Sequence, residues 1–437
     1  MVIASMKKRL LVILGAGTSV SLGMPSMSQL NRKMEDWAKE WSATQAHGIN
    51  YFQRITENRK HVEKEPNFEN LLADMNSLIN SFPFWGSEIA PSKAPDPVLM
   101  WFRAADAFAD LNIRPNIGHD NPRSEIIDQL DFLYVKLADS FRSACVEFSK
   151  SDLDNPRHPF QLYMGFFAYL REHFDIGIYN LNYDSLAYTA TKDLFTGFDD
   201  DTGESLPDII THRQEWEFIY HIHGSVHFTF KDVSVMTDTV FYLKPEEEIV
   251  WQKDLSKDRF TYTNGSRSRS DGRHFQAASL VAGGWKLEQI QSEPFLSLYS
   301  QFPRHVSEAD AILVAGYGFA DSHINSVLHN YLHRTEPEKR PPILVIDFAV
   351  DRERMPLRFD SWANAMTHTF DIVNRGFRHM GYHVDECDLP DELRPMDTEF
   401  TLNPPVAVWC GGFDKTFMRS FEFMRWLDGY RYAFPLL

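Results

Sequence analysis

The sequence predicts an α/β protein built on a parallel β-sheet, and two kinds of segment carry that prediction. Short, continuous apolar runs such as RLLVIL (9–14) lead directly into a glycine or a polar residue, which is typical of strands buried on both faces of a parallel sheet. Segments with apolar residues at helical spacing separate these runs. Strand and helix therefore alternate along the chain, and helices are expected to cover the sheet.

Five apolar runs are expected to form the strands. They are RLLVIL, FDIGIYNL from Phe174, EFIYHIHG from Glu217, DAILVAG from Asp310 and PILVIDF from Pro342. Long segments interrupt this series. The spacing predicts one sheet domain over 1–350, with a helical insertion at about 27–160 and a polar, turn-rich insertion at about 229–286.

Three amphipathic helices are expected within the helical insertion. Ser26 and Gln29 are spaced as a capping box at the start of the first, and the third is expected over about 124–148. The apolar stripes of the three helices are Leu30, Met34, Trp37 and Trp41, then Leu71, Leu72, Met75, Leu78 and Ile79, then Ile126, Leu130, Leu137, Phe141 and Cys145. Core packing explains such stripes better than ligand binding does, so Cys145 is expected to be a core thiol.

Beyond residue 350 the pattern is irregular, and 351–437 is expected to form a C-terminal region used for packing or oligomerisation. One helical face there carries Phe417, Phe421, Met424 and Leu427. Aromatic side chains bury large areas both in cores and between subunits. Packing on the chain's own domain and packing on a second copy are both open.

Composition excludes several classes of protein. Lys and Arg number 44 against 61 Asp and Glu, a formal net charge of -17, so direct nucleic-acid binding is not expected. Three distant cysteines, Cys145, Cys387 and Cys410, form no pair or framework, which favours a reducing cytoplasm. No apolar run approaches the roughly 18 residues of a membrane span, so no membrane association is expected.

The loop GAGTS follows the first predicted strand and is a candidate phosphate-binding turn. Gly15 and Gly17 would let backbone amides approach a diphosphate at the start of a helix. A third glycine of the dinucleotide fingerprint is absent, because Val20 stands in its place. A tight strand-to-helix turn without a ligand is the alternative. Gly23 and Pro25 then form a second turn, where a loop could fold over a ligand.

Polar residues follow the second predicted strand in the segment YNLNYDS. Asn180, Asn182 and Asp184 alternate, so an extended backbone would turn all three side chains to one side. This is the carboxyl edge of the sheet, where ligands bind in open α/β folds. The alternative is a turn, which Asn and Asp favour by bonding to their own backbone.

Two histidines end the third predicted strand in YHIHGSVH. A neutral imidazole, which titrates near about pH 6.5, can accept a hydroxyl proton at cytoplasmic pH, and His223 precedes a glycine. Structural histidines bonded to the backbone are the alternative. A metal site through His221, His223 and His227 lacks a carboxylate or cysteine in that segment, so no metal is expected.

The two late strands also end in polar turns. Gly316 and Gly318 lie at the end of DAILVAG, in the segment VAGYGFADSHIN. Asp347 closes PILVIDF, where an acidic residue can accept both hydroxyls of an adenosine ribose. Together these turns predict a Rossmann-like nucleotide site at one edge of the sheet.

These segments, in this order, resemble the sirtuin family, and the match is to the divergent bacterial branch of sirtuin-like NAD-consuming effectors. The resemblance rests on GAGTS with its trailing Gly-x-Pro, on N-x-D, on H-G and on GYGFADSHI. It implies a sirtuin core that binds NAD+ as a substrate. It further implies catalytic roles for Asn182, which would place the attacking group, and for His223, which would polarise the hydroxyls of the nicotinamide ribose.

The resemblance also implies which residues bind the rest of NAD+. Gly15, Ala16, Gly17 and Ser19 would hold the diphosphate, Asp184 would contact the nicotinamide amide or its ribose, Gly316, Gly318 and Asp347 would lie on the adenosine side, and Pro25 would belong to the lid loop. Two departures are visible. Ser26-Met27-Ser28 follows Pro25 where deacetylases have an acidic residue, Phe and Arg, and the later insertion lacks the four cysteines of the deacetylase zinc module, so no zinc is expected.

The expected activity is therefore that of an NAD+ glycohydrolase, which cleaves NAD+ to nicotinamide and ADP-ribose, as the NAD-depleting effector of a bacterial anti-phage defence system. The alternatives are a sirtuin-type protein deacylase or ADP-ribosyltransferase, and a non-enzymatic nucleotide-sensing subunit of a larger complex. The resemblance also implies restraint by assembly. A homo-oligomer is expected, with a HerA-type hexameric ATPase or a short argonaute as the partner.

Overall fold

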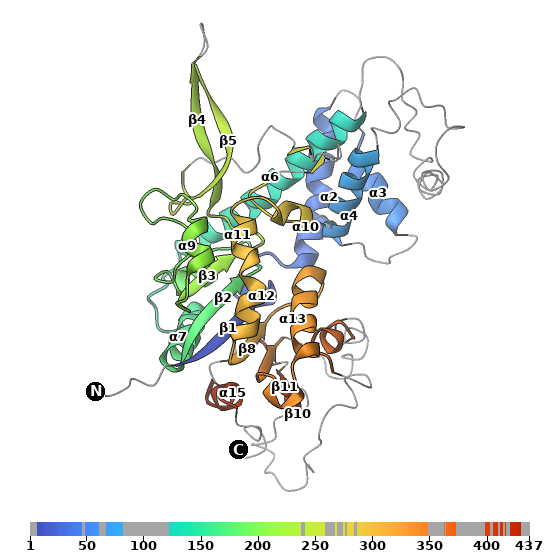
Figure 1. The fold of residues 1–437 in the computed structure, drawn as a ribbon. Coiled ribbons are helices and arrows are strands. Elements are labelled where there is room, and N and C mark those ends of the chain that lie inside the picture. Colours follow the sequence, from blue (N-terminus) through green and yellow to red (C-terminus); the bar gives the residue numbers. More distant parts are fainter. Residues whose placement is uncertain are drawn as a thin grey trace. The chain divides into compact units, whose positions relative to one another are not determined.

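The computed structural model divides the chain into two compact units (Figure 1). Unit 1 comprises Met1–Met24, Ala144–Ser225 and Glu293–Leu437, and unit 2 comprises Pro25–Ser143 and Val226–Ser292. Most of the helical insertion and the polar insertion thus belong to the same unit. The residues described within these units are 7–45, 49–60, 67–81, 122–236, 241–257, 267–268, 274–275, 278–283, 286–347, 362, 364–372, 398–402, 405–409, 411–413, 416 and 420–429.

Unit 1 contains a seven-stranded sheet in the order β10-β11-β9-β8-β1-β2-β3. Its strands are β1 (Lys8–Leu14), β2 (Phe174–Asn180), β3 (Phe218–His221), β8 (Ala311–Ala315), β9 (Ile343–Ile346), β10 (Thr398–Leu402) and β11 (Pro405–Trp409). All neighbours pair in parallel except β10 and β11, which are antiparallel. Counted in chain order, the six parallel strands follow the Rossmann order 3-2-1-4-5-6, which confirms the predicted fold class.

The five predicted strands all form, and their apolar runs explain why. Leu10 to Leu14 of β1 and Ala311 to Ala315 of β8 are fully buried, as expected for strands covered on both faces. The flanking helices and turn of unit 1 are α1 (Gly17–Val20), α7 (Pro159–His173), α8 (Leu186–Ala190), α9 (Pro207–His212), α11 (Phe295–Ser300), α12 (Phe302–Glu308), α13 (Ser322–Arg334), η3 (Pro337–Lys339) and α15 (Ser420–Leu427). Among them, α12 packs on β1 and α13, whereas α15 packs on β8, β9 and α7.

The C-terminal region contributes two strands that the sequence analysis did not predict. The run PVAVW forms β11, which pairs with β9, and β10 pairs with β11. The face of α15 also differs from the predicted stripe. Phe423, Met424, Trp426 and Leu427 are buried, whereas Phe421 is 55% exposed, and Phe417 lies outside the described residues. Because the Trp426 indole donates to the backbone of β9, this helix packs on its own domain.

The part of unit 2 that comes from the helical insertion consists mainly of α-helices. The helices of unit 2 are α2 (Met27–Thr44), α3 (Tyr51–Arg59), α4 (Phe68–Ser81), the larger part of α6 (Pro122–Ser149) and α10 (Lys286–Ile290). The Ser26–Gln29 capping box is present, and the three predicted stripes are buried, except that Ala38 takes the core position expected of Trp37. The predicted core thiol Cys145 is buried in unit 1, where its Sγ accepts from the Ser185 amide at 3.4 Å.

The polar insertion contains paired strands that its turn-rich sequence did not predict. An antiparallel ribbon joins β4 (Phe228–Met236) to β5 (Phe241–Trp251), and β6 (Arg267–Ser268) pairs with β7 (His274–Phe275). Alternation in FTFKDVSVM was the missed signal for β4.

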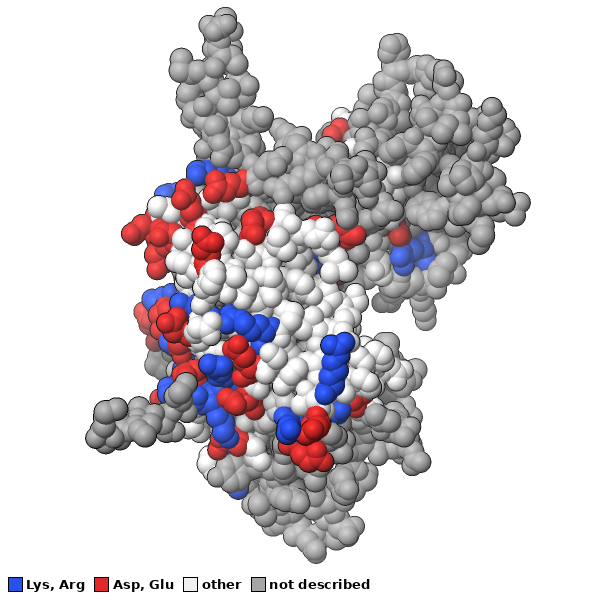
Figure 2. All heavy atoms as spheres, in the orientation of Figure 1, with Lys and Arg blue, Asp and Glu red and all other residues white. Residues whose placement is uncertain are grey.

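No helix among the described residues has the length and apolar character needed to cross a membrane. Acidic and basic side chains are interspersed on the described part of the face in Figure 2. Ion pairs between such side chains are present, and Arg171 pairs with both Asp193 and Glu217 at 2.8 Å. The part of that face that the structure describes shows no broad basic surface for a phosphate backbone.

Candidate functional site

The predicted site residues of unit 1 follow strand ends at one edge of the sheet. Leu14, Asn180 and His221 are register partners on β1, β2 and β3, and Leu14 also pairs with Ala315 on β8. The chain therefore leaves these four strands at the same level. The loops that follow hold the predicted glycines, Asn182 and His223, and this is the edge where open α/β sheets bind ligands.

The glycines of GAGTS permit two loops to touch. The Gly15 amide donates to Ala315 at 2.9 Å, and the Gly17 amide donates to Gly316 at 2.9 Å. A Cβ on Gly15 would lie 2.7 Å from the Tyr317 Cα, and one on Gly17 would lie 2.8 Å from the Gly316 Cα. Any side chain at either position would force the loops after β1 and β8 apart.

This packing changes what the loop can offer to a diphosphate. The amides of Gly15 and Gly17 already donate to the β8 loop, and those of Thr18 and Ser19 donate to the carbonyls of Gly15 and Ala16. Among the described groups of this loop, the Ala16 amide is then the one left for an anion, because the Ser19 hydroxyl accepts from Asn182 and donates to Asp184. Because α1 has only four residues, its dipole adds little.

Asn182 is held against this loop by two hydroxyls. Its Nδ2 donates to Thr18 Oγ1 at 3.1 Å and to Ser19 Oγ at 3.2 Å. The residue is 4% exposed, and no donor among the described residues lies within hydrogen-bond distance of its Oδ1. A buried acceptor in that state is uncommon and indicates a bound water or ligand group.

Asp184 lies beneath the same loop. It is buried and accepts from the Leu186 amide at 3.0 Å, at the start of α8. Burial raises the pKa of its carboxyl group, while the bonds from Leu186 and from the Ser19 hydroxyl act in the opposite direction. Ser19 therefore links Asn182 to Asp184.

Asn180 and His221 support the two strand ends. The Asn180 Oδ1 accepts from the Asn182 amide at 3.2 Å, and its Nδ2 contacts His221 Nδ1 at 3.2 Å. These bonds tie β3 to β2 and fix the start of the Asn182 loop. Asn180 thus stabilises the ends of β2 and β3 through its bonds to the Asn182 amide and to His221.

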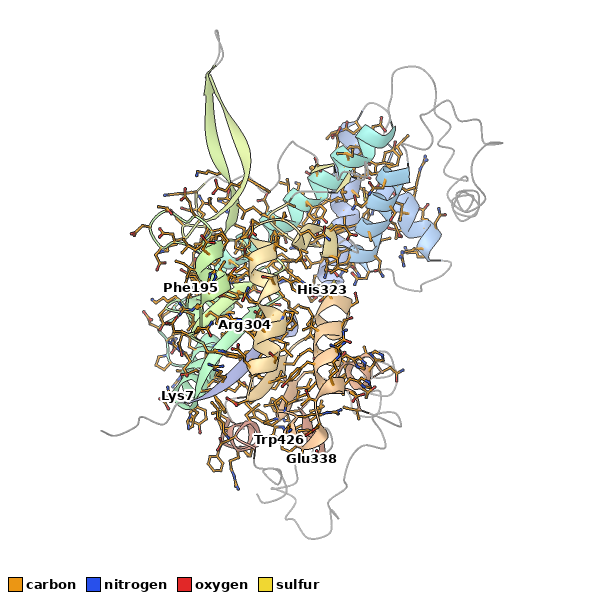
Figure 3. All side chains as sticks on the ribbon, in the orientation of Figure 1. Lys7, Phe195, Arg304, His323, Glu338 and Trp426 are labelled. Atoms are coloured by element: carbon orange, nitrogen blue, oxygen red, sulfur yellow. The ribbon has the colours of Figure 1, made fainter. Side chains whose placement is uncertain are left out.

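His223 lies two residues beyond β3 and meets another histidine. Its Nε2 is 3.1 Å from the Nε2 of His323, and both residues are buried. His323 lies in the first turn of α13, as Figure 3 shows. Asp321 directly precedes that helix, and one ligand atom from each of the three residues lies within 4.8 Å of the others. The segment from 221 to 227 therefore contributes one of these three groups.

The remaining predicted residues lie at the ends of β8 and β9 or outside unit 1. Gly316 has a φ of 61°, and Gly318 has open space around it. Asp347 directly follows β9, as predicted, and its amide donates to Trp409 of β11 at 2.8 Å. Pro25 is the first residue of unit 2.

Sequence reasoning missed three residues of this edge. Thr18 stands inside GAGTS, and a hydroxyl next to Ser19 at a helix start was a usable signal. Asp321 and His323 stand inside the quoted GYGFADSHIN. Only the fold brings that turn to the H-G segment, so their meeting with His223 had no sequence signal.

Comparisons with known proteins find similarity over part of the chain. Residues 177–369 match the family model of the SIR2-like domain. That stretch is less than half of the chain and begins within β2, so it includes Asn182, His223 and Asp347 but not the GAGTS loop. No curated protein matches the chain.

Solved structures of Sir2 homologues are similar at low identity. A Sir2 homologue mutant in complex with 2′-O-acetyl ADP ribose is 13% identical, with 84% of this chain and 94% of that chain covered and a TM-score of 0.31. A Sir2 homolog–NAD complex is 11% identical, with 84% and 91% covered and a TM-score of 0.31. Sir2Tm bound to a propionylated peptide is 9% identical, with 80% and 84% covered and a TM-score of 0.28. Because these scores are low, the fold assignment rests on the strand order and the sirtuin-like similarity on the family match.

Proposed function

We propose that the chain is an NAD+ glycohydrolase, which hydrolyses NAD+ to nicotinamide and ADP-ribose. The SIR2-like domain match supports NAD+ as the substrate. In this reaction the bond between C1′ of the ribose and the nicotinamide nitrogen breaks, and water attacks the oxocarbenium-like ribose. Nicotinamide leaves as a neutral molecule, and the water gives up one proton.

The observation that carries the proposal is the buried Oδ1 of Asn182. Its amide is anchored by the hydroxyls of Thr18 and Ser19, so the oxygen is fixed in place with no described donor. A water that donates to this oxygen would be oriented for attack on the ribose. Such positioning is a recognised source of rate acceleration.

His223 is proposed to polarise the hydroxyls of the nicotinamide ribose. It is buried two residues beyond the end of β3, and Asn182 lies two residues beyond the end of the neighbouring strand β2. A neutral imidazole can accept the hydroxyl proton and so stabilise the positive charge that develops on the ribose. The two residues would then act on one sugar from neighbouring strands.

The other ends of NAD+ are assigned by the same resemblance. The GAGTS loop with Ala16 and Ser19 would hold the diphosphate, within the limits set by its internal bonds. Asp347 and the Gly316–Gly318 turn would take the adenosine side, Asp184 would take the nicotinamide side, and Pro25 would belong to the lid.

Two features disfavour a sirtuin-type protein deacylase and a non-enzymatic sensor, whereas an ADP-ribosyltransferase stays an alternative. The deacylase groove is supported by a four-cysteine zinc module, and this chain has three cysteines, of which Cys145 is buried in unit 1. We therefore propose that no structural zinc is needed. A non-enzymatic sensor, in turn, would not need a buried amide that two hydroxyls fix in place, as they fix Asn182.

The test is nicotinamide release from NAD+ by the purified full chain, for Asn182→Ala and His223→Ala beside the parent protein. Each substitution should lower kcat by at least about 100-fold, the size of effect seen when one preorganised polar group is lost. Free nicotinamide and ADP-ribose should appear in equal amounts.

His333→Gln is the matched control. His333 lies on α13, and its side chain is 66% exposed, so its loss should leave nicotinamide release within about twofold of the parent protein. Parent-like release by Asn182→Ala and His223→Ala would remove the assignment. Release only in the presence of an acylated peptide would favour the deacylase.

Uncontrolled NAD+ cleavage would harm the host cell, so we also propose a cytoplasmic anti-phage effector that is restrained by assembly. A homo-oligomer with a HerA-type hexameric ATPase or a short argonaute as its partner fits that need. The exposed Phe421 of α15 is a candidate contact. Light scattering of Phe421→Ser should then give a smaller mass than the parent, whereas Leu296→Ser, another exposed apolar position at 45%, should not. A monomeric parent at all concentrations would remove this part.

A further inference from the structure

We propose that His223, Asp321 and His323 form an open binding site for a divalent transition-metal ion of the class that imidazole prefers, such as Ni²⁺, Co²⁺ or Zn²⁺. The ion would be exchangeable and would serve regulation, since the sheet core of unit 1 is built without it. The site lies at the carboxyl edge of the sheet, at the ends of β3 and β8.

The spacing of the donor atoms fits a metal. The Nε2 atoms of His223 and His323 are 3.1 Å apart, and all three ligand atoms lie within 4.8 Å of one another. Two nitrogens that bind one tetrahedral ion at about 2.0–2.1 Å lie roughly 3.3 Å apart. Small side-chain rotations would therefore suffice to place an ion between the rings.

The donor set also selects the class of ion. Two imidazoles and one carboxylate suit Zn²⁺, Ni²⁺, Co²⁺ and Fe²⁺, whereas Mg²⁺ and Ca²⁺ prefer oxygen donors. The segment from 221 to 227 contains no carboxylate. The fold supplies it, because the turn after β8 brings Asp321 and His323 to His223.

The backbone of the site is held rigidly enough to position these donors. The Asp321 carbonyl accepts from the Ile324 and Asn325 amides at 3.1 Å and from the Tyr317 hydroxyl at 3.2 Å. The His323 carbonyl accepts from the Tyr299 hydroxyl at 3.1 Å. Asp321 is the N-cap residue of α13, yet its side chain makes no capping bond to that helix.

Without an ion, the same two nitrogens form a hydrogen bond. One ring must then carry its proton on Nε2, whereas coordination needs both rings protonated on Nδ1. An ion would therefore replace the shared proton, and three protein ligands would leave at least one position open for water. A closed structural site would have four protein ligands.

Occupation has a consequence that rests on the proposed function. An ion on the Nε2 of His223 removes the atom that would accept the ribose hydroxyl proton. Metal binding should therefore stop NAD+ cleavage, and the ion would act as a reversible inhibitor. The binding itself is independent of whether NAD+ is the substrate.

The experiment is titration of the chelator-treated full chain with Ni²⁺, followed by calorimetry, and with Co²⁺, followed by its visible absorption. The parent should bind one ion per chain, with the Co²⁺ spectrum of mixed nitrogen and oxygen ligation, and should not bind Mg²⁺ at the same concentration. His323→Gln should weaken Ni²⁺ binding by at least about 100-fold, more than the 10–100-fold typical of outer groups. Asp321→Asn, which preserves side-chain size, should weaken it by about 10-fold.

A rival surface site supplies the control. His329 and His333 are stacked on α13 with ring centroids 5.6 Å apart, and such a pair one turn apart, half-buried at His329 and exposed at His333, can also chelate Ni²⁺. His333→Gln should therefore bind like the parent protein. Loss of binding in His333→Gln, unchanged binding in His323→Gln and Asp321→Asn, or no binding by the parent would each overturn the proposal.

Measurements of NAD+ cleavage distinguish the proposed metal site from the proposed glycohydrolase activity. If the parent hydrolyses NAD+, stoichiometric Ni²⁺ should block release of nicotinamide, and a chelator should restore it. Binding without any NAD+ cleavage would keep the metal site and remove the glycohydrolase. Cleavage that persists with the site filled would show that the ion does not take the catalytic nitrogen, and would overturn the inhibitory role.

Discussion

The ends of β2 and β3 lie side by side and hold their functional candidates in different ways. Each strand leaves the sheet at a register partner, Asn180 or His221, and each presents a buried residue two positions later. Asn182 is anchored by the hydroxyls of Thr18 and Ser19, which are uncharged at neutral pH. His223 faces a second histidine and an aspartate, which can exchange protons or bind a cation.

The two strand ends are therefore suited to different tasks: Asn182 to positioning a water molecule, and the groups around His223 to binding a proton or a cation. The fixed amide of Asn182 offers one oxygen in one direction, which is what an attacking water needs. His223 instead has an imidazole and a carboxylate group beside it, which the proposed metal site would use. In the proposed reaction, one edge of the sheet would thus supply Asn182 as a fixed acceptor and His223 as a base.

The largest effect is expected from a substitution that breaks the contact between the loops after β1 and β8, because Asn182 packs on the first of these loops and Asp321 and His323 follow the second. Gly316 has a φ of 61°, and a Cβ there would lie 2.7 Å from the Gly17 carbonyl carbon. Gly316→Ala combines backbone strain with overlap and should lower the free energy of unfolding by at least about 3 kcal/mol. Urea unfolding followed by circular dichroism measures it.

Gly318→Ala is the control for that prediction. Gly318 follows the same strand, but a Cβ there meets nothing within 4 Å. Its substitution should change the free energy of unfolding by no more than about 0.5 kcal/mol. Equal losses in the two variants would show that the close approach of the loops does not limit stability.

The sequence predicted the strands of this fold for a simple reason. Buried parallel strands need continuous apolar residues, and β1, β2, β3, β8 and β9 all have them. The capping box at Ser26 is equally local, since its bonds join residues three positions apart. By contrast β11, the run PVAVW, was missed because a short apolar run next to prolines is ambiguous outside its sheet.

The site was only half predictable, because its two halves depend on contacts of different range. Asn182 and Asp184 share one short segment, so their proximity could be read from the chain. His223 and His323 are brought together by the order of strands in the sheet. The glycines of GAGTS were interpreted as phosphate ligands, whereas in the structure their amides bond to the β8 loop, a contact without a sequence signal.

A third histidine, His305 of α12, sharpens the contrast, because it packs against the same two strands but is held neutral by burial. His305 stacks on Phe218 of β3, and its Nδ1 is 2.8 Å from the Tyr179 hydroxyl of β2. Burial, aided by the charges of Arg304 and Arg9, lowers its pKa to about 3. The pKa of His305 in the folded state lies below its value of about 6.5 in the unfolded state. Its contribution to the free energy of unfolding is therefore complete above about pH 6.5 and is lost as the pH falls toward 3.

Between pH 7 and pH 5 this histidine should therefore reduce the free energy of unfolding by about 2 kcal/mol. His305→Gln keeps a neutral polar side chain and should lack that part of the acid dependence, although it is less stable at pH 7. Urea unfolding at both pH values gives the difference between the two proteins. Parallel losses in parent and variant would mean that His305 titrates normally in the folded state.

The smallest expected effect tests whether hydroxyls really fix Asn182. Thr18→Val and Ser19→Ala each remove one of the two acceptors of its Nδ2. One bond remains in each variant, so kcat for nicotinamide release should fall by about 10-fold, which corresponds to about 1.4 kcal/mol. KM should change little for Thr18→Val, whereas Ser19→Ala should also raise KM, because Ser19 is assigned to the diphosphate. Thr18→Ser should restore most of the rate, because it restores the oxygen. Thr211→Val is the control, since Thr211 is exposed and its hydroxyl donates to the Pro207 carbonyl within α9. If Thr18→Val matched that control, the positioning of Asn182 would not depend on the Thr18 hydroxyl, and the contrast between the two strand ends would have to rest on the Asn182 backbone instead.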